Sequence, residues 1–381
     1  MKISRTYLAW LSALLLSAAP ILAEDPKPPE NGTAAPAANA TPAEAALFGG
    51  HITLNGYMNV ESDYQPTEFG LGDKNASIDT DVMELLLNYK ADDKFRVSAA
   101  IDYEHGTDTE LGQGHLTTAW LFLEYAPSDR FKIRAGKFLV PFGYFNEIHG
   151  AKNLFLARDE AKTTLKPQKI AANGFRYAPK WETGLEALGR LPVGKSQSIE
   201  YLVVVGNGYQ TETNPYEQDN NSKKSFTARA AYMPTDELTI GVSGYSDFLS
   251  QTTANKTNWG RLQSVGTFVK YSTDRWKLLY EVNQGRQRKP GAAATARELG
   301  QAAEVGYVMG RITPYVQVQT VSTHSGSANE RANAIIAGFD YTVGRFVLKL
   351  QDAEWHGSDN KKFNFPGGRY NEVQAAVFYA F

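Results

Sequence analysis

Polar and apolar residues alternate along many short segments of this chain. In residues 95–104, one face carries Phe95, Val97, Ala99, Ile101 and Tyr103, and the other carries Arg96, Ser98, Ala100, Asp102 and Glu104. Residues 276–283 and 346–351 alternate in the same way. Because side chains alternate across a β-strand with a period of two residues, the pattern predicts strands that are apolar on one face and polar on the other.

Seven short turn sequences, rich in Gly, Pro, Asp and Ser, divide the chain. They lie at 91–94, 127–130, 192–195, 234–237, 272–275, 309–311 and 343–345. Each interval between neighbouring turns can hold a strand, a longer polar loop and a returning strand. Seven turns alternating with eight longer loops make fifteen connections, and therefore sixteen strands. The prediction is an all-β fold, a sixteen-stranded antiparallel transmembrane β-barrel with short periplasmic turns and long extracellular loops.

Strand length and hydropathy support a membrane barrel over a soluble sandwich, which would alternate as well. The strands are expected to have roughly nine to eleven residues, the length that a tilted strand needs to cross a bilayer. No long apolar run follows the first two dozen residues, so spanning helices are excluded. The mean hydropathy of -0.38 fits a barrel, because polar residues of the lumen dilute those that face lipid.

The chain is rich in aromatic residues, with 20 Tyr, 19 Phe and 6 Trp. Several tyrosines at predicted strand ends suit an interfacial girdle, where an apolar ring carries a hydrated hydroxyl. They are Tyr57, Tyr89, Tyr125, Tyr232, Tyr271 and Tyr341. Ordinary aromatic core packing is the alternative interpretation of these residues.

The first 23 residues have the features of an export signal. Lys2 and Arg5 precede an apolar stretch from Tyr7 to Ala19, and Ala23 is the expected last residue before cleavage. Residues 24–48 are rich in Pro and Ala and are predicted to be a disordered periplasmic lead-in to a barrel at 49–381. Without the signal, 37 basic residues stand against 41 acidic ones, so no overall basic field exists and no nucleic-acid partner is predicted.

The final segment, from Tyr370 to Phe381, alternates strictly. Val373, Ala375, Val377, Tyr379 and Phe381 share one face. An alternating last strand that ends in Phe looks like the terminal insertion signal of outer-membrane barrels. Together with the export signal, it predicts a protein of the bacterial outer membrane with both termini in the periplasm.

One passage carries a resemblance to a known family. Residues 131–144, Phe-Lys-Ile-Arg-Ala-Gly-Lys-Phe-Leu-Val-Pro-Phe-Gly-Tyr, resemble the strand and G-x-F-x-x-P-F-G passage of the phosphate-selective porin O and P family. Residues 54–57 and 181–184 are similar to that family as well. The resemblance implies a channel for small anionic or polar solutes, a homotrimer, and a third loop that folds inward and narrows the pore.

That third loop, at about 142–172, is where the function is expected to lie. Leu154, Phe155, Leu156, Ala161 and Leu165 have partial helical spacing, which predicts a short helix packed on the inner wall. The proposed constriction and anion-binding residues are Lys132, Arg134, Lys162, Lys166, Lys169 and Arg176. A ladder of fixed cations in a narrow pore favours anions.

Several alternatives stay open at this point. The lysines could be solvated or could contact phosphates of lipopolysaccharide, which together with outer-membrane lipid is an expected partner. Acids of the lumen could offset the lysines and leave a general diffusion porin without anion preference. The candidates for that offset are Asp102, Glu104, Glu124, Glu281 and Glu304.

Other function classes have less support in the sequence. The chain has no Cys, and its six His show no metal-ligand spacing, so no metal site and no cofactor are predicted. No G-x-S-x-G sequence and no distinctive carboxylate pair occur, so an enzyme is not predicted. A barrel without transport, serving as an adhesin or as a sheath for a partner protein, is the remaining alternative.

Overall fold

The structure, a computed structural model, describes a large part of the chain. The described residues are 43–47, 50–64, 77–104, 115–146, 155–165, 167, 174–209, 219, 221, 223–249, 260–326, 328–357 and 369–381. The chain divides into two compact units, Met1–Ala35 and Pro36–Phe381, and all described residues belong to the second unit. The predicted export signal at 1–23 lies outside the described residues and stays a prediction.

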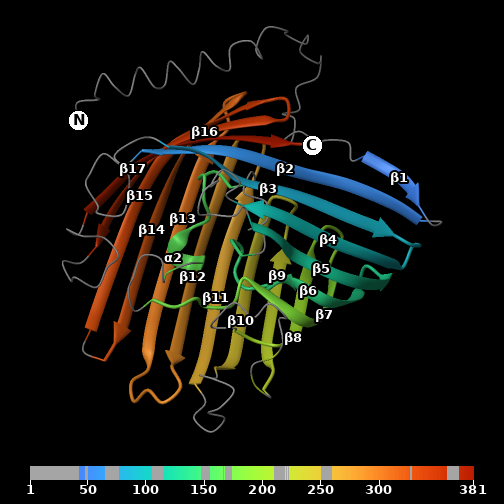
Figure 1. Cartoon of the computed structure of the whole chain (residues 1–381), viewed down its shortest axis with the longest axis horizontal. Coiled ribbons are helices and arrows are strands. Elements are labelled where there is room, and N and C mark those ends of the chain that lie inside the picture. The colour runs from blue at the N-terminus through green and yellow to red at the C-terminus, as the bar shows by residue number, and fades with distance from the viewer. Residues whose placement is uncertain are drawn as a thin grey trace. The chain divides into compact units, whose positions relative to one another are not determined.

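Sixteen antiparallel strands form a closed barrel, as the turn pattern predicted (Figure 1). In chain order they are β2 (Gly50–Tyr64), β3 (Ser77–Lys90), β4 (Phe95–Glu104), β5 (His115–Ser128), β6 (Phe131–Leu139), β7 (Trp181–Pro192), β8 (Ser198–Gly206), β9 (Ser225–Met233), β10 (Leu238–Leu249), β11 (Gly260–Ser272), β12 (Trp276–Arg288), β13 (Ala296–Tyr307), β14 (Ile312–Ser325), β15 (Ala328–Val343), β16 (Phe346–Gly357) and β17 (Arg369–Ala380). Each strand pairs with the next in sequence, and β17 pairs with β2 from Tyr64 opposite Val373 to Tyr57 opposite Ala380.

All seven predicted turns connect neighbouring strands at one end of the barrel. The expected length of nine to eleven residues is confirmed for β4, β6, β8 and β9. The other twelve strands are longer, up to 16 residues in β15, and so exceed the length that a tilted strand needs to cross a bilayer. The expectation of a long loop at every opposite connection was wrong between β14 and β15, which only residues 326 and 327 separate. Gly326 has a φ of 62°, the left-handed conformation that such a tight hairpin requires.

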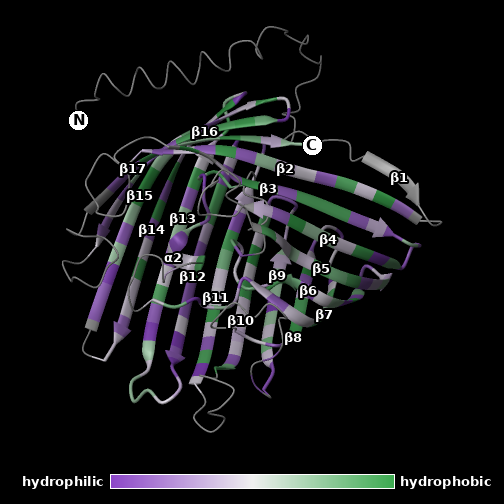
Figure 2. Ribbon diagram, in the orientation of Figure 1, coloured by the Kyte–Doolittle hydropathy of each residue, from purple (hydrophilic) through white to green (hydrophobic). Residues whose placement is uncertain are grey.

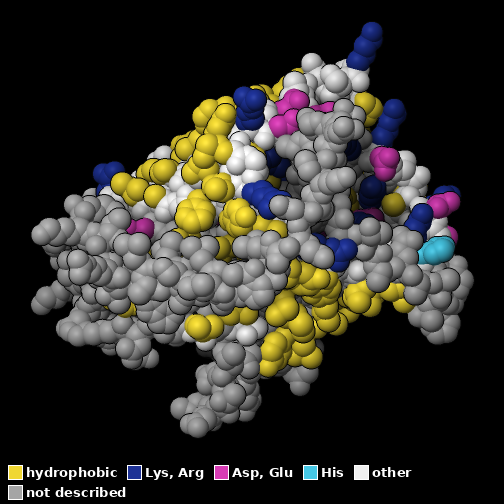
Figure 3. Space-filling model, turned by 90° about the horizontal axis from the view of Figure 1, so that it is seen from above, with side chains coloured by type: hydrophobic (Ala, Val, Ile, Leu, Met, Phe, Trp, Pro, Cys, Tyr) yellow, Lys and Arg dark blue, Asp and Glu magenta, His cyan; other side chains and the backbone are white. Residues whose placement is uncertain are grey.

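The predicted facing pattern is also confirmed. In β4, the Ile101 side is exposed and the Asp102 side is buried. Exposed apolar side chains on other strands include Leu121, Val265 and Ile335, whereas Gln317 and Glu281 are buried on the inner side. Figure 2 shows the alternation along the ribbons, and Figure 3 shows hydrophobic side chains gathered over the described part of one outer face. An apolar exterior around a polar interior requires lipid rather than water on the outside.

A row of aromatic residues marks the turn end of the outer face, and we call it the turn-side girdle. It consists of Tyr89, Phe95, Tyr125, Phe131, Tyr232, Tyr271, Trp276, Tyr307, Tyr341, Phe346 and Tyr379. Neighbouring rings are in contact: the Phe95 and Tyr125 ring centroids are 4.7 Å apart, as are those of Phe346 and Tyr379. Five of the six predicted girdle tyrosines belong to this row.

Tyr57, the sixth predicted girdle residue, was assigned to the wrong face. Its side chain is buried on the lumen side, where it packs with Val82 and Phe378. Tyr57 pairs with Glu84, which is an inward position of β3, so the two-residue period turns its ring away from lipid.

The segment before the barrel is partly ordered. Residues 43–47, the end of the stretch predicted to be disordered, form β1 (Ala43–Leu47). This strand pairs with residues 50–54 of β2, along the part of its edge that β17 does not reach. The remaining residues of the predicted lead-in lie outside the described part of the chain.

No helix among the described residues is long and apolar enough to cross a membrane. The described part contains α2 (Lys162–Leu165), a helix of four residues in the connection between β6 and β7.

Candidate functional site

The connection between β6 and β7 is the longest of the barrel, and its first described part runs along the lumen wall. The Gly143 N–H donates to Ser243 Oγ on β10 at 2.9 Å. The N–H groups of Tyr144 and Phe145 both donate to Glu281 Oε2 on β12, at 2.6 and 3.0 Å. Gly143 has a φ of 70°, and a Cβ there would lie 2.6 Å from Glu281 Oε1, so only glycine lets the backbone approach this carboxylate.

The middle part, residues 155–165, is fastened to β12–β16. The Ala157 N–H donates to Glu304 Oε2 at 3.3 Å and the Arg158 N–H to Gln351 Oε1 at 2.8 Å. In the opposite direction, Lys349 Nζ donates to the carbonyl oxygens of Phe155 and Leu156. The helix α2 then lies against β12, β13 and β14, inside the barrel (Figure 1).

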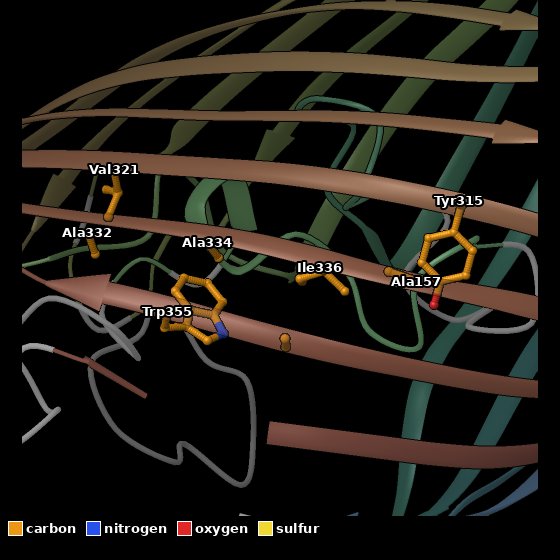
Figure 4. Packing of buried hydrophobic residues seen from close by; sticks show 8 residues of the cluster. Ala157, Tyr315, Val321, Ala332, Ala334, Ile336 and Trp355 are labelled. Carbon is orange, nitrogen blue, oxygen red and sulfur yellow. The ribbon is translucent and has the colours of Figure 1, made fainter. Parts of the chain in front are cut away.

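Apolar contacts complete the attachment of this connection. Phe145, Phe155 and Ala161 pack with Leu279 of β12 and Ala302 of β13. Ala157 packs against a cluster on the inner faces of β14, β15 and β16. Figure 4 shows side chains of this cluster, which includes Tyr315, Val321, Ala332, Ala334, Ile336 and Trp355. Most inward positions of the barrel are polar, but these inward positions of β14, β15 and β16 are apolar. They provide an apolar surface on the wall for the connection to pack against.

Among the described residues, three buried glutamates of the wall accept hydrogen bonds from backbone N–H groups of the connection. They are Glu281 and Glu304, named above, and Glu298, whose Oε2 accepts from the Phe175 N–H at 3.2 Å. Glu281 and Glu304 were predicted as acids that offset the lumen cations. Their contacts show that they also hold the connection on the wall, and the backbone N–H groups supply the hydrogen bonds that a buried carboxylate needs.

Arg158 links the same connection to β2, the first strand of the barrel. Its guanidinium contacts Glu61 at 3.2 Å, Asp159 at 2.8 Å and also Asp63. Burial lowers the pKa of Arg158, but the carboxylates of Asp159, Asp63 and Glu61 outweigh burial and hold that pKa well above its ordinary value. Sequence reasoning missed Arg158, although an arginine that follows the apolar residues 154–157 and directly precedes Asp159 and Glu160 was visible.

The six predicted constriction residues have different environments. Lys162 lies in α2 with its Nζ 6.0 Å from the centre of the Trp355 ring, and Arg176 lies further along the connection near Glu160. Burial lowers the pKa of Arg176 from its ordinary value. Lys166 and Lys169 lie outside the described residues.

Lys132 and Arg134 of β6 face the lumen as predicted, but both are paired with acids. Lys132 contacts the exposed Asp129 of the adjacent turn at 3.4 Å. Arg134 lies between two buried carboxylates, with Nε 2.6 Å from Glu124 and a terminal nitrogen 2.9 Å from Glu186. Arg96 adds a contact of 2.8 Å to Glu124, so a row of alternating charges crosses β4, β5, β6 and β7.

Comparisons with known proteins agree with this geometry at the level of the fold. No protein-family profile matches the chain. An uncharacterised protein of Aquifex aeolicus is 22% identical over 210 residues, which cover 51% of this chain and 44% of that protein. The match therefore spans less than half of the relative's length.

Solved structures are similar over most of the barrel. The anion-selective porin of Comamonas acidovorans has a TM-score of 0.62 at 12% identity, covering 87% of this chain and 100% of that one. The outer-membrane channel DcaP of Acinetobacter baumannii has a TM-score of 0.59 at 13% identity, with 88% and 99% covered. A trimer form of OmpT from Vibrio cholerae has a TM-score of 0.57 at 13% identity, with 87% and 99% covered.

The chain has the porin fold. The even number of strands, the short turns at one end and the apolar outer face place the barrel in the outer membrane of a bacterium. Within this fold, the lumen and the connection fastened inside it form the candidate site. Among the described residues, no group of His, Asp and Glu is placed to hold a metal ion.

The position of Arg134 in this porin fold leads to a stability prediction. Arg134→Ala removes the cation that contacts both buried acids and leaves Glu124 with Arg96, so we expect the free energy of unfolding to fall by about 2–4 kcal/mol. Lys132→Ala, on the same strand and face, removes only a pair with an exposed acid and should change it by about 0.5 kcal/mol or less. Urea titration of the barrel in lipid vesicles measures both values, and equal losses would contradict the assignment.

Proposed function

We propose that the protein is an outer-membrane porin, a water-filled channel for the passive diffusion of small polar solutes. The observation that carries the proposal is a closed sixteen-stranded barrel in which one long connection is fastened to the inner wall by hydrogen bonds from several strands. Sixteen strands leave room for an aqueous channel, and a segment held inside narrows it. An enzymatic activity is not part of the proposal.

A preference for small anions is the second candidate function. Lys162 of α2 is the described cation that supports it, and it lines one small pocket together with the acids Asp159, Glu160 and Glu372. Lys166, Lys169 and Arg176 belong with Lys162 to residues 161–181, a stretch of the sequence without Asp or Glu. Lys132 and Arg134 contribute less than their charges suggest, since nearby acids neutralise them. The resemblance to the phosphate-selective porin O and P family points in the same direction, with phosphate as one candidate solute.

Planar-bilayer recordings of the purified protein test the channel itself. We expect discrete conductance steps in symmetric KCl when the protein is added alone. A barrel that inserts but gives no conductance steps would contradict the channel proposal and favour an adhesin or a sheath around a partner protein.

The reversal potential under a KCl gradient tests the preference for anions. We expect anion preference in the native protein and a shift toward cations in the Lys162→Glu, Lys166→Glu, Lys169→Glu variant, because charges at a constriction act at low effective dielectric. Lys195→Glu is the control: it lies on an exposed turn, and at physiological salt charges act over about 8 Å. Cation preference in the native protein, or equal shifts of the reversal potential in both variants, would contradict the anion preference. The protein would then be a general diffusion porin.

Two further parts of the proposal concern assembly and export. We propose that residues 1–23 direct export and are removed, and that the remaining residues before the barrel lie in the periplasm. We also propose a homotrimer surrounded by outer-membrane lipid and lipopolysaccharide. The trimer form of the Vibrio cholerae protein with the same fold supports the oligomer.

A further inference from the structure

The connection between β8 and β9 begins by crossing the inner face of the barrel, at the end opposite the short turns. The Gly208 N–H donates to Glu182 Oε1 on β7 at 2.7 Å, and the Tyr209 N–H donates to Asp247 Oδ2 on β10 at 2.6 Å. Both acids are buried residues of the inner face. Because β9 separates β8 from β10, the chain passes over β9 on the lumen side between these two contacts.

The backbone at Gly208 is fitted closely to the carboxylate of Asp247. Gly208 has a φ of 84°, and a Cβ there would lie 2.6 Å from Asp247 Oδ1, so the close approach requires glycine. The Tyr245 hydroxyl also donates to Asp247 Oδ2, at 3.1 Å. Gly143 lies against Glu281 in the same way at the start of the β6–β7 connection. Two connections are thus fastened inside the barrel by the same device.

The second attachment lies nearer the loop end of the barrel than α2. Asp247 is nine residues from Leu238, the turn end of β10. The hydroxyl of Thr163 in α2 donates to the Gln301 carbonyl, which is only six residues from Tyr307, the turn end of β13. A tilted strand rises about 2.5 Å per residue along the membrane normal, so the two levels differ by roughly 8 Å.

The β6–β7 connection reaches the level of Asp247 after α2. The Phe175 N–H donates to Glu298, which is nine residues from the turn end of β13. Phe175 and Tyr177 are buried in one apolar cluster of the wall, and Tyr209 packs against that cluster. Arg176, between them, is only partly buried and interacts electrostatically with Tyr209. Two connections that are distant in sequence therefore meet at this level.

We propose that Tyr209 and Arg176 form a second constriction of the channel, in series with the one at α2 and nearer the loop end. The inference rests on the proposed porin function and adds a separate size limit for solutes that enter from the loop end. Glu182 and Asp247 are positioning residues, because they hold residues 207–209 across the inner face. A solute from the loop end passes the Tyr209 ring and the Arg176 guanidinium before it reaches Lys162.

Neutral polymers of graded size, added to one side of a planar bilayer at a time, measure the two constrictions separately. A polymer that enters the channel lowers the single-channel conductance, whereas an excluded polymer does not. Tyr209→Ala should raise the size limit from the loop side and leave the limit from the turn side unchanged. Glu281→Ala is the reciprocal control, because it releases the other connection, nearer the turns, and should raise the limit from the turn side.

Variants of the positioning residues separate attachment from the ring itself. Asp247→Ala with Glu182→Ala should raise the loop-side limit as Tyr209→Ala does, because residues 207–209 lose both acceptors. Asp247→Asn with Glu182→Gln keeps an oxygen acceptor at each place and should restore the native limit. An unchanged loop-side limit in Tyr209→Ala channels that still conduct would overturn the second constriction. A native barrel that inserts without conducting would instead contradict the porin proposal.

Cysteine cross-linking tests the contact between the two connections independently, because the chain contains no Cys of its own. The full chain carrying Tyr209→Cys and Arg176→Cys should be linked internally by a short bismaleimide, and the link should lower the single-channel conductance. Tyr209→Cys with Lys195→Cys is the matched control, because Lys195 lies on an exposed turn at the opposite end of the barrel. Equal linkage in the control, no linkage in the test pair, or linkage without a change in conductance would overturn the inference.

Discussion

Glu281→Ala should release the start of the β6–β7 connection from the lumen wall and enlarge the single-channel conductance. Glu281 Oε2 accepts two N–H groups, from Tyr144 and Phe145, and its other oxygen accepts from Asn283 Nδ2 at 2.8 Å. Hydrogen bonds to a charged group contribute about 1.5–3 kcal/mol each, so their loss removes much of the attachment at this point. The conductance should also become noisier, because the released segment can enter and leave the current path.

Two variants sharpen this measurement. Glu281→Gln keeps an oxygen acceptor at the same place and should stay close to the native conductance. Glu281→Ala combined with Glu298→Ala and Glu304→Ala should increase the conductance further, since it removes the three buried carboxylates that accept from backbone N–H groups in the described part of the connection. An unchanged conductance in the triple variant, with the barrel correctly inserted, would show that the connection does not narrow the channel.

Deletion of Phe381 should strongly reduce assembly into the outer membrane while export proceeds. The Phe381 N–H donates to the Gly56 carbonyl at 2.9 Å, and the Gly56 N–H donates to the Phe381 carbonyl at 3.1 Å. The last residue thus continues the pairing of β17 with β2, where the first and last strands close the barrel. Its ring is 6.2 Å from that of Tyr379, at the turn end of the outer face.

Controls separate the aromatic ring from the closing hydrogen bonds. Phe381→Tyr keeps both and should assemble normally, whereas Phe381→Ala keeps the backbone pair and loses the ring. Gly56→Val keeps Phe381, but even a Cβ at this position would lie 2.6 Å from the Phe381 ring and 2.4 Å from the Glu84 carbonyl oxygen. We expect it to hinder closure. Surface labelling of intact cells measures all four variants, and normal surface levels of the deletion would remove the proposed role.

Short-range patterns predicted the barrel well because they follow directly from backbone geometry. The seven turns and the faces of β4, β12 and β16 depend only on local residue types and on the two-residue period of a strand. Tyr57 shows where this reasoning fails. A tyrosine near a strand end suggested the membrane interface, but the register against Glu84 decides which face it occupies.

The charges of the lumen could not be assigned from sequence, because their partners lie far away along the chain. Glu281 accepts from residues more than 130 positions earlier, and Arg158 pairs with Glu61 and Asp63 of β2. Arg134 was predicted as a cation available to anions, yet its neighbours in the barrel are Glu124 and Glu186. Formal charge is a property of the sequence, whereas the electrostatic environment is a property of the closed barrel.

The sequence by itself determined the number of strands, the end of the barrel at which the short turns lie, and the side of most strands that faces lipid. These features follow from turn-forming residues and alternation, which act within a few residues. Only the tertiary structure decided which acids hold the β6–β7 connection and which cations are neutralised. Each of those depends on strands that meet only when the barrel closes, because register and pairing bring distant side chains together.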